Sequence, residues 1–189
     1  MTRVLIGGIG NVLLGDDGVG PYLVHLLTSR YEFDEGVEIV DLGTPALDLV
    51  DRISSKDLVI LIDSVKSGEA PGTILLYRKE EIMQHRPAVR MDPHSPALVD
   101  AVLSAELLGT APSNLLLIGI AAETFDSGCS MSEVVKASLE PAIHEILHEL
   151  DRCGILYARR EEPVETGIWW TLDPSLESEN SPRNYRLNV

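Results

Sequence analysis

Basic residues and long apolar runs are scarce in this sequence of 189 residues. Only 15 Lys and Arg stand against 30 Asp and Glu, which gives a formal net charge of −15 with neutral His. Such a charge repels phosphate backbones and anionic lipid surfaces. No stretch approaches the roughly 18 apolar residues that a membrane span requires, and the short apolar run at the start is not a signal peptide. We therefore expect neither nucleic acid nor a membrane as a partner.

Cysteine is scarce as well, with only Cys129 and Cys153 in the chain. Two residues at this spacing form no disulfide framework and no CxxC pair, which is typical of a reducing compartment. We therefore expect a cytoplasmic protein. With 44% apolar residues, the composition is that of one folded domain. No long apolar stripe is left over for a partner, so a monomer is expected.

The apolar pattern alternates between strands and helices. Segments typical of buried strands occupy 3–8, 37–41, 57–63, 73–77 and 114–121. Helical spacing of apolar residues occupies 18–31, 46–54, 96–108 and the segment after 130. The link between 57–63 and 73–77 is too short for a parallel crossover, so the second of these strands should be antiparallel. The order of elements predicts an α/β fold, a three-layer α/β/α sandwich with a mostly parallel sheet.

The end of the chain changes character. A capping box of Ser130 and Glu133 predicts the start of the last helix. Pro141 lies inside that helix and should kink or divide it. Beyond residue 154 the apolar residues show no helical or strand periodicity, and both tryptophans lie there. We therefore predict a single domain over 1–154 and an acidic tail over 155–189 that is extended or partly disordered.

A glycine-rich turn follows the first strand and raises the question of a nucleotide site. Gly8 and Gly10 match the first two glycines of a dinucleotide fingerprint, but the third position is Leu13. Asp16 and Asp17 precede the following helix, where a pyrophosphate would otherwise lie. Nucleotide binding is therefore not expected.

A second candidate is the HExxH motif of His144, Glu145 and His148. In zinc peptidases the two histidines bind zinc and the glutamate is the general base. At about 100° per residue, both histidines fall opposite the apolar stripe of the helix and should face solvent. A third ligand would have to come from the tail, for example Glu161 or Glu165. A zinc metallopeptidase of this kind is kept as an alternative.

A third candidate is dispersed along the chain. Asp16 and Asp17 follow the first strand, Asp63 ends a central strand, and His94 precedes a helix. The carboxyl ends of parallel strands share one edge of the sheet, so these side chains should converge there. Two carboxylates and an imidazole can hold nickel or zinc and leave positions open. Each residue also has a purely structural explanation, as a helix cap or a strand end.

These residues carry a resemblance to a known family. The segment GIGNVLLGDDGVG at 8–20, the LIDSV around Asp63 and the Pro93-His94 pair resemble the hydrogenase maturation endopeptidases. The likeness spans about 3–152. It implies a mixed five-stranded sheet between helix layers. It also implies that Asp17, Asp63 and His94 match the metal-contacting acid, aspartate and histidine of the family, whose members carry Asp or Glu at the first position.

The resemblance further implies an activity. Members of this family remove a short C-terminal extension from the precursor of the nickel–iron hydrogenase large subunit after nickel insertion, and the nickel belongs to that substrate. We expect Asp17, Asp63 and His94 to bind it and gate cleavage. The metal then polarises the scissile carbonyl or lowers the pKa of a bound water, and Asp16 is a candidate base. A non-catalytic assembly factor that only checks for nickel is the other alternative.

Overall fold

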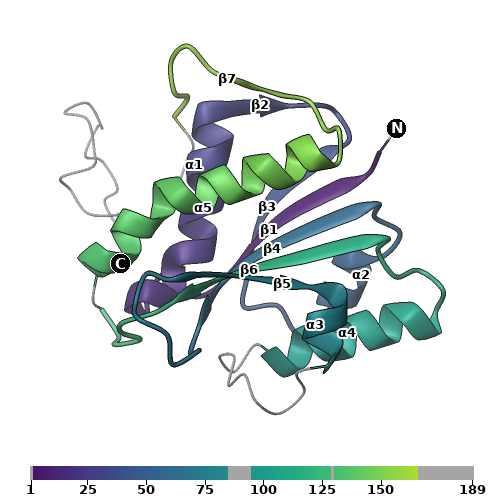
Figure 1. The fold of residues 1–189 in the computed structure, drawn as a ribbon, viewed down its shortest axis with the longest axis horizontal. Coiled ribbons are helices and arrows are strands. Elements are labelled where there is room, and N and C mark those ends of the chain that lie inside the picture. Colours follow the sequence, from purple (N-terminus) through teal and green to yellow (C-terminus); the bar gives the residue numbers. More distant parts are fainter. Residues whose placement is uncertain (1, 85–94, 129, 166–189) are drawn as a thin grey trace, which may run out of the picture.

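A mixed sheet lies between two layers of helices in the computed structural model, which describes residues 2–84, 95–128 and 130–165 (Figure 1). Its strands are β1 (Val4–Ile9), β3 (Val37–Gly43), β4 (Leu58–Val65), β5 (Ile74–Arg78) and β6 (Asn114–Ala121). The strand order is β3-β1-β4-β6-β5. All neighbours are parallel except β5 and β6, which are antiparallel. The predicted three-layer α/β/α fold with one antiparallel strand is confirmed.

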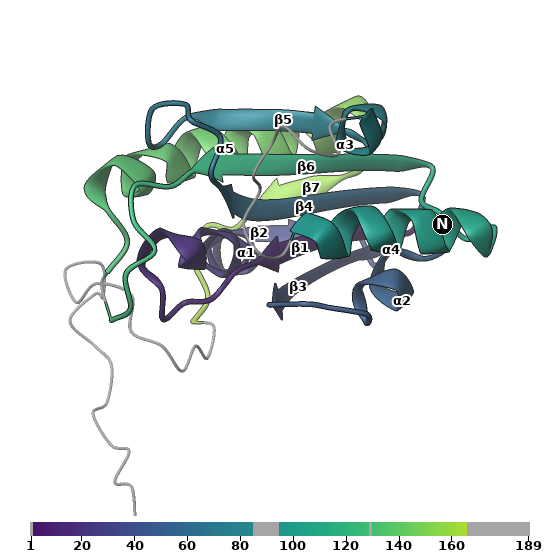
Figure 2. The same cartoon turned by 90° about the horizontal axis from the view of Figure 1, so that it is seen from below.

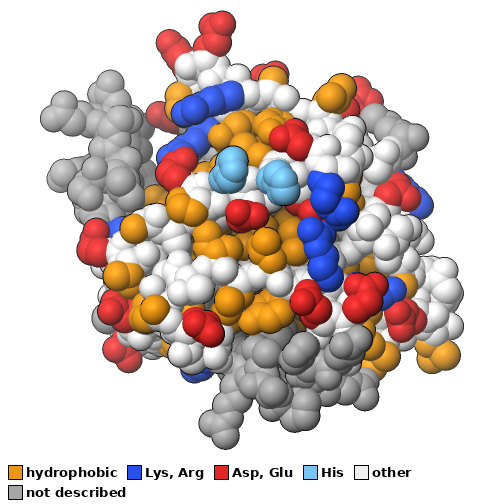
Figure 3. All heavy atoms as spheres, viewed as in Figure 1, with side chains coloured by type: hydrophobic (Ala, Val, Ile, Leu, Met, Phe, Trp, Pro, Cys, Tyr) orange, Lys and Arg blue, Asp and Glu red, His pale blue; other side chains and the backbone are white. Residues whose placement is uncertain are grey.

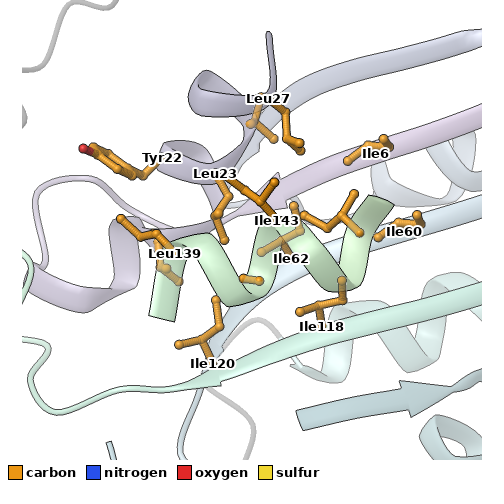
Figure 4. Close-up of a cluster of buried hydrophobic side chains, with 14 of the residues drawn as sticks. Ile6, Tyr22, Leu23, Leu27, Ile60, Ile62, Ile118, Ile120, Leu139 and Ile143 are labelled. Atoms are coloured by element: carbon orange, nitrogen blue, oxygen red, sulfur yellow. The ribbon is translucent and has the colours of Figure 1, made fainter. Parts of the chain in front are cut away.

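The helices divide between the two faces of the sheet (Figures 1 and 2). One face is covered by α1 (Val19–Arg30) and α5 (Glu133–Arg152), and the other by α2 (Leu49–Ile53), α3 (Lys79–Gln84) and α4 (Ser95–Leu107). Figure 4 shows the first core, in which side chains of α1 and α5 pack on those of the central strands. Because both faces are covered, β1 and β4 are buried along their whole length and read as continuous apolar runs.

Strand β4 supplies alternate side chains to the two cores. Ile60 and Ile62 belong to the cluster under α1 and α5, whereas Val59 and Leu61 belong to the cluster under α2 and α4. Successive side chains of a strand point to opposite faces. Residues 63 and 64 at the end of β4 therefore serve opposite faces of the sheet.

Helix α5 begins slightly later than the sequence predicts. Its N-cap is Ser132, whose side chain accepts a hydrogen bond from the Val135 backbone N–H, so the predicted start at Ser130 is wrong. Pro141 lies inside the helix without dividing it. The proline and Ala137, whose carbonyl loses its usual donor, are both exposed, so water can satisfy that carbonyl.

The packed domain continues beyond the predicted boundary at 154. Ile155 is buried, and β7 (Tyr157–Arg159) pairs antiparallel with β2 (Tyr31–Phe33). Farther along, the Val164 N–H donates to the Ser29 carbonyl at 3.0 Å. The boundary after 154 was therefore placed too early, because residues 155–165 are fastened to the end of α1. The rest of the predicted tail, with both tryptophans, lies outside the described residues. In the part of the chain that the structure describes, no helix is long and apolar enough to span a membrane.

Candidate functional site

Two of the predicted site residues, Asp17 and Asp63, lie at the carboxyl edge of the sheet. Parallel strands β1 and β4 are neighbours, and Gly8 of β1 is in register with Ile62 of β4. Asp63 is thus the next residue along β4. The loop after β1 leads into a short 3-10 helix, η1 (Gly15–Gly18), which contacts β4 and carries Asp16 and Asp17. The fold brings Asp17 and Asp63 to one edge, as parallel strands require.

Glycines hold η1 and α1 directly against the strands. A Cβ on Gly10, which has φ +137°, would lie 1.8 Å from the Asp17 carbonyl oxygen. A Cβ on Gly20 would lie 2.3 Å from the carbonyl oxygen of Ile9 and 2.6 Å from that of Ile62. The first turn of α1 therefore touches the backbones of β1 and β4. Sequence reasoning sought a third glycine at Leu13 and missed that Gly20 makes this close approach.

Asp16 connects η1 to two distant segments of the chain. Its carboxylate is fully buried and accepts hydrogen bonds from the backbone N–H groups of Glu123 and Thr124 and from both the N–H and the hydroxyl of Ser132. These donors, at 2.6 to 3.1 Å, occupy both carboxylate oxygens. Asp16 therefore holds η1 against the end of β6 and the start of α5, and its role as a base stays a prediction.

Asp17 points toward the end of β4. It is 1% exposed, and the Ser64 hydroxyl donates to its Oδ1 at 2.7 Å. The Asn11 backbone N–H donates to its Oδ2 at 2.8 Å. Both donors are neutral, so these bonds fix the orientation of the carboxylate without supplying an opposite charge.

Asp63 projects from the other face of β4, the one under α4. It is 6% exposed. His94 lies outside the described residues, but the next residue, Ser95, is the first of α4. The far end of α4 leads to β6, which starts at the amino edge, where Asn114 pairs with Leu58. The first turn of this helix of about 20 Å is therefore directed toward the carboxyl edge, as Figure 2 shows.

The HExxH motif lies on the outer surface of α5. His144 and His148 are exposed, as the position of the apolar stripe predicts, and Glu145 is partly exposed. Figure 3 shows two histidine side chains next to each other on this face. Over the ranges 2–84, 95–128 and 130–165, which include Glu161 and Glu165, no group of three His, Cys, Asp or Glu side chains is placed to hold a metal ion. Glu161 and Glu165 are thus not placed to complete a zinc site with the two histidines.

The donor chemistry of the carboxyl edge suits a divalent cation. Asp17 and Asp63 are both buried at this edge, and a nearby cation favours the charged form of a carboxylate. Carboxylate oxygens with one imidazole form a hard-to-borderline ligand set that accepts first-row divalent ions. Within the described chain the set holds Asp17 and Asp63, and the sequence adds His94 just ahead of α4.

Known proteins share this sequence pattern and fold. The family model described as hydrogenase maturation protease matches residues 21–149. A hydrogenase expression/formation protein, HoxM of Azotobacter vinelandii, is 39% identical over 164 residues, which is 86% of this chain and 79% of that protein. The hydrogenase 2 maturation protease of Escherichia coli is 32% identical over 84% of this chain and 97% of its own length.

A solved structure extends the match to three dimensions. The hydrogenase maturating endopeptidase HybD of Escherichia coli superposes with a TM-score of 0.79 at 31% sequence identity. The superposition covers 84% of this chain and 98% of HybD. The matched range of the family model contains Asp63 and His94 and begins shortly after Asp17.

Proposed function

This chain belongs to the hydrogenase maturation protease family, and on that premise we propose that it removes the C-terminal extension of a nickel–iron hydrogenase large-subunit precursor after nickel insertion. Family membership makes the protein a hydrolase of peptide bonds. The proposal adds which substrate is cleaved, when it is cleaved and which residues bind it. It also assigns the protein to the cytoplasm as a monomer, in keeping with its two cysteines and acidic composition.

The observation that carries the proposal is the pair of buried carboxylates at the carboxyl edge. Asp17 is held by neutral donors, and Asp63 lies at the end of the adjacent strand. We assign to Asp17, Asp63 and His94 the binding of the nickel that the precursor carries, as part of the substrate. A precursor without nickel then offers this edge nothing to bind, which makes nickel the signal for cleavage.

The residues of this chain position and orient the substrate. A nickel ion at the site polarises a carbonyl or lowers the pKa of a bound water. Asp17 is hydrogen-bonded to Ser64, whose side chain lies on the face of β4 opposite to that of Asp63. Asp16 holds η1 in place through its hydrogen bonds to the loop after β6 and to Ser132. These hydrogen bonds keep the proposed ligands in fixed positions. Fixed positions matter because a misplacement of about 1 Å costs about 100-fold in reaction rate.

Mass spectrometry of the precursor tests the proposal. Purified protein is incubated with nickel-loaded and with nickel-free precursor, and the mass of each product is measured. We expect a loss of C-terminal mass from the nickel-loaded form only, and no loss with the Asp63→Ala variant. Intact nickel-loaded precursor would favour a non-catalytic assembly factor instead. Equal cleavage of both forms would remove nickel from the proposal.

A further inference from the structure

We propose that Ser64 is a positioning residue for this reaction, whose hydroxyl holds the Asp17 carboxylate in the orientation that meets the precursor's nickel. The inference rests on the proposed function and adds a residue to it. Ser64 does not itself contact nickel in this account. It acts through Asp17, by a hydrogen bond from the neighbouring strand.

The geometry gives Asp17 two fixed supports. Ser64 is fully buried, and its Oγ donates to Asp17 Oδ1 at 2.7 Å. The Asn11 N–H holds the other oxygen at 2.8 Å from the loop after β1. Rotation of the carboxylate about its Cβ–Cγ bond would break both bonds. Hydrogen bonds to an ionised acceptor are roughly twice as strong as neutral ones, so this orientation is well defined.

The place of Ser64 in β4 also needs an explanation. The strand reads LVILIDSV, and all eight residues are buried. Ser64 shares its face with Ile60 and Ile62, under α1 and α5. A buried hydroxyl costs free energy unless it is hydrogen-bonded, and an alanine would pack there without that cost. The partner that Ser64 finds is Asp17.

Strand alternation therefore gives β4 two separate roles at its end. Asp63 faces the α4 side as a ligand, and Ser64 faces the η1 side as the support of the other carboxylate. Groups that hydrogen-bond metal ligands fix ligand orientation, and their loss typically costs about 10- to 100-fold in metal affinity or activity. Loss of the Ser64 hydroxyl should have an effect in this range on nickel recognition.

The test compares two serine-to-alanine substitutions at buried positions. Ser138 is also buried, and its hydroxyl donates to the Val135 carbonyl at 2.7 Å, within α5. The measured quantity is the affinity for nickel-loaded precursor divided by the affinity for nickel-free precursor. We expect Ser64→Ala to lower this ratio about tenfold and Ser138→Ala to leave it unchanged. A loss of stability alone does not change a ratio measured on folded protein.

Further variants separate failure of this inference from failure of the proposed function. Asp17→Ala should bring the ratio to one. If the unaltered protein shows no preference for nickel-loaded precursor, the proposed function fails. If Asp17→Ala loses the preference and Ser64→Ala keeps it, Ser64 has no positioning role.

Should Ser64→Ala not fold, the Ser64→Cys variant is measured in its place, because a thiol has a similar shape and is a weak donor. We expect a reduced ratio, and an unchanged one would overturn the inference.

Discussion

The carboxyl edge of the sheet and the C-terminal half of α5 each bury a carboxylate, in different ways. Glu149 on α5 is 1% exposed and accepts paired hydrogen bonds from the guanidinium groups of Arg78 and Arg152, at 2.6 to 2.9 Å. Asp17 accepts from a hydroxyl and a backbone N–H. The charge of Glu149 is thus neutralised within the fold, whereas the bonds to Asp17 leave its charge available to a cation. Glu149 and Asp17 are thus equally buried but differ in the charge of their partners.

A similar contrast concerns how the candidate ligands are spaced along the sequence. His144 and His148 form a contiguous motif, yet they lie on an exposed helix face with no third ligand in the described chain (Figure 3). The carboxyl-edge set is scattered over 77 positions of sequence from Asp17 to His94, and the parallel topology gathers its two carboxylates. Topology thus brings together residues that are far apart in the sequence.

The largest effect is expected from a substitution that disturbs the packing of η1 against the loop after β1. Gly10→Ala places a Cβ against the Asp17 carbonyl and forces an unfavourable φ of +137° on alanine. We expect a loss of at least about 3 kcal/mol in unfolding free energy and a fall of about 100-fold in precursor processing. Urea denaturation and a timed processing assay measure the two quantities.

Gly128→Ala is the matched control for that substitution. Gly128 also has a positive φ, of +74°, but a Cβ there meets nothing within 4 Å. It should therefore lose only the conformational part, about 1 kcal/mol, and keep its processing rate. Equal effects of the two substitutions would show that the contact between Gly10 and Asp17 does not position the site.

The next largest effect concerns Asp16. Asp16→Ala leaves four partly buried donors without their acceptor and loosens η1 from the start of α5. We expect a loss of about 3 kcal/mol in thermal or denaturant unfolding. Asp151→Ala, which removes an acceptor of one exposed bond from Tyr157, should cost less than about 1 kcal/mol. An Asp16→Ala variant as stable as the unaltered protein would show that these hydrogen bonds do not hold η1 in place.

A smaller effect, on stability alone, is expected at Glu149. Burial by itself raises the pKa of this carboxyl, but the hydrogen bonds from Arg152 and Arg78 outweigh it and lower the pKa from 4.5 to about 2. Since the folded pKa is depressed, the stabilisation is present above pH 4.5 and is lost as the pH falls toward 2.

Glu149→Gln checks that dependence. Allowing for solvent screening, we expect the variant to be about 2 kcal/mol less stable than the unaltered protein at pH 7. The difference should shrink as the pH falls from 4.5 to 2. Processing of the precursor at pH 7 should not change. A loss of processing without a loss of stability would place Glu149 in the functional site and erase the contrast with Asp17.

Much of the fold follows from the sequence because burial on both faces leaves a clear pattern. The apolar runs of β4 and β6 predict central parallel strands, and the short link before β5 predicts its antiparallel direction. The sequence does not predict that the domain extends through β7. The strand Tyr157–Arg159 is half exposed and too short to show an alternating apolar pattern. Its partner β2 directly follows α1 and is equally short.

The sequence names the candidate residues of the site, but not the contacts that distinguish them. Asp16 and Asp17 are adjacent and identical in type, and only the donors around them assign one to the fold and the other to the edge. Those donors come from Ser64 and Ser132, far away in the sequence. Ser64 itself carries no signal in the sequence beyond being a polar residue at the end of a buried strand. Long-range hydrogen bonds of this kind become visible only in three dimensions.

One comparison of two histidines tests the central claim most directly. The C-terminal mass of nickel-loaded precursor is measured after incubation with His94→Ala and, separately, with His148→Ala, each checked for a cooperative unfolding transition. The account predicts intact precursor with His94→Ala and full cleavage with His148→Ala, because the latter side chain is exposed on α5. Full cleavage by His94→Ala, or its loss with His148→Ala alone, would contradict it and move the chemistry to the outer face of α5.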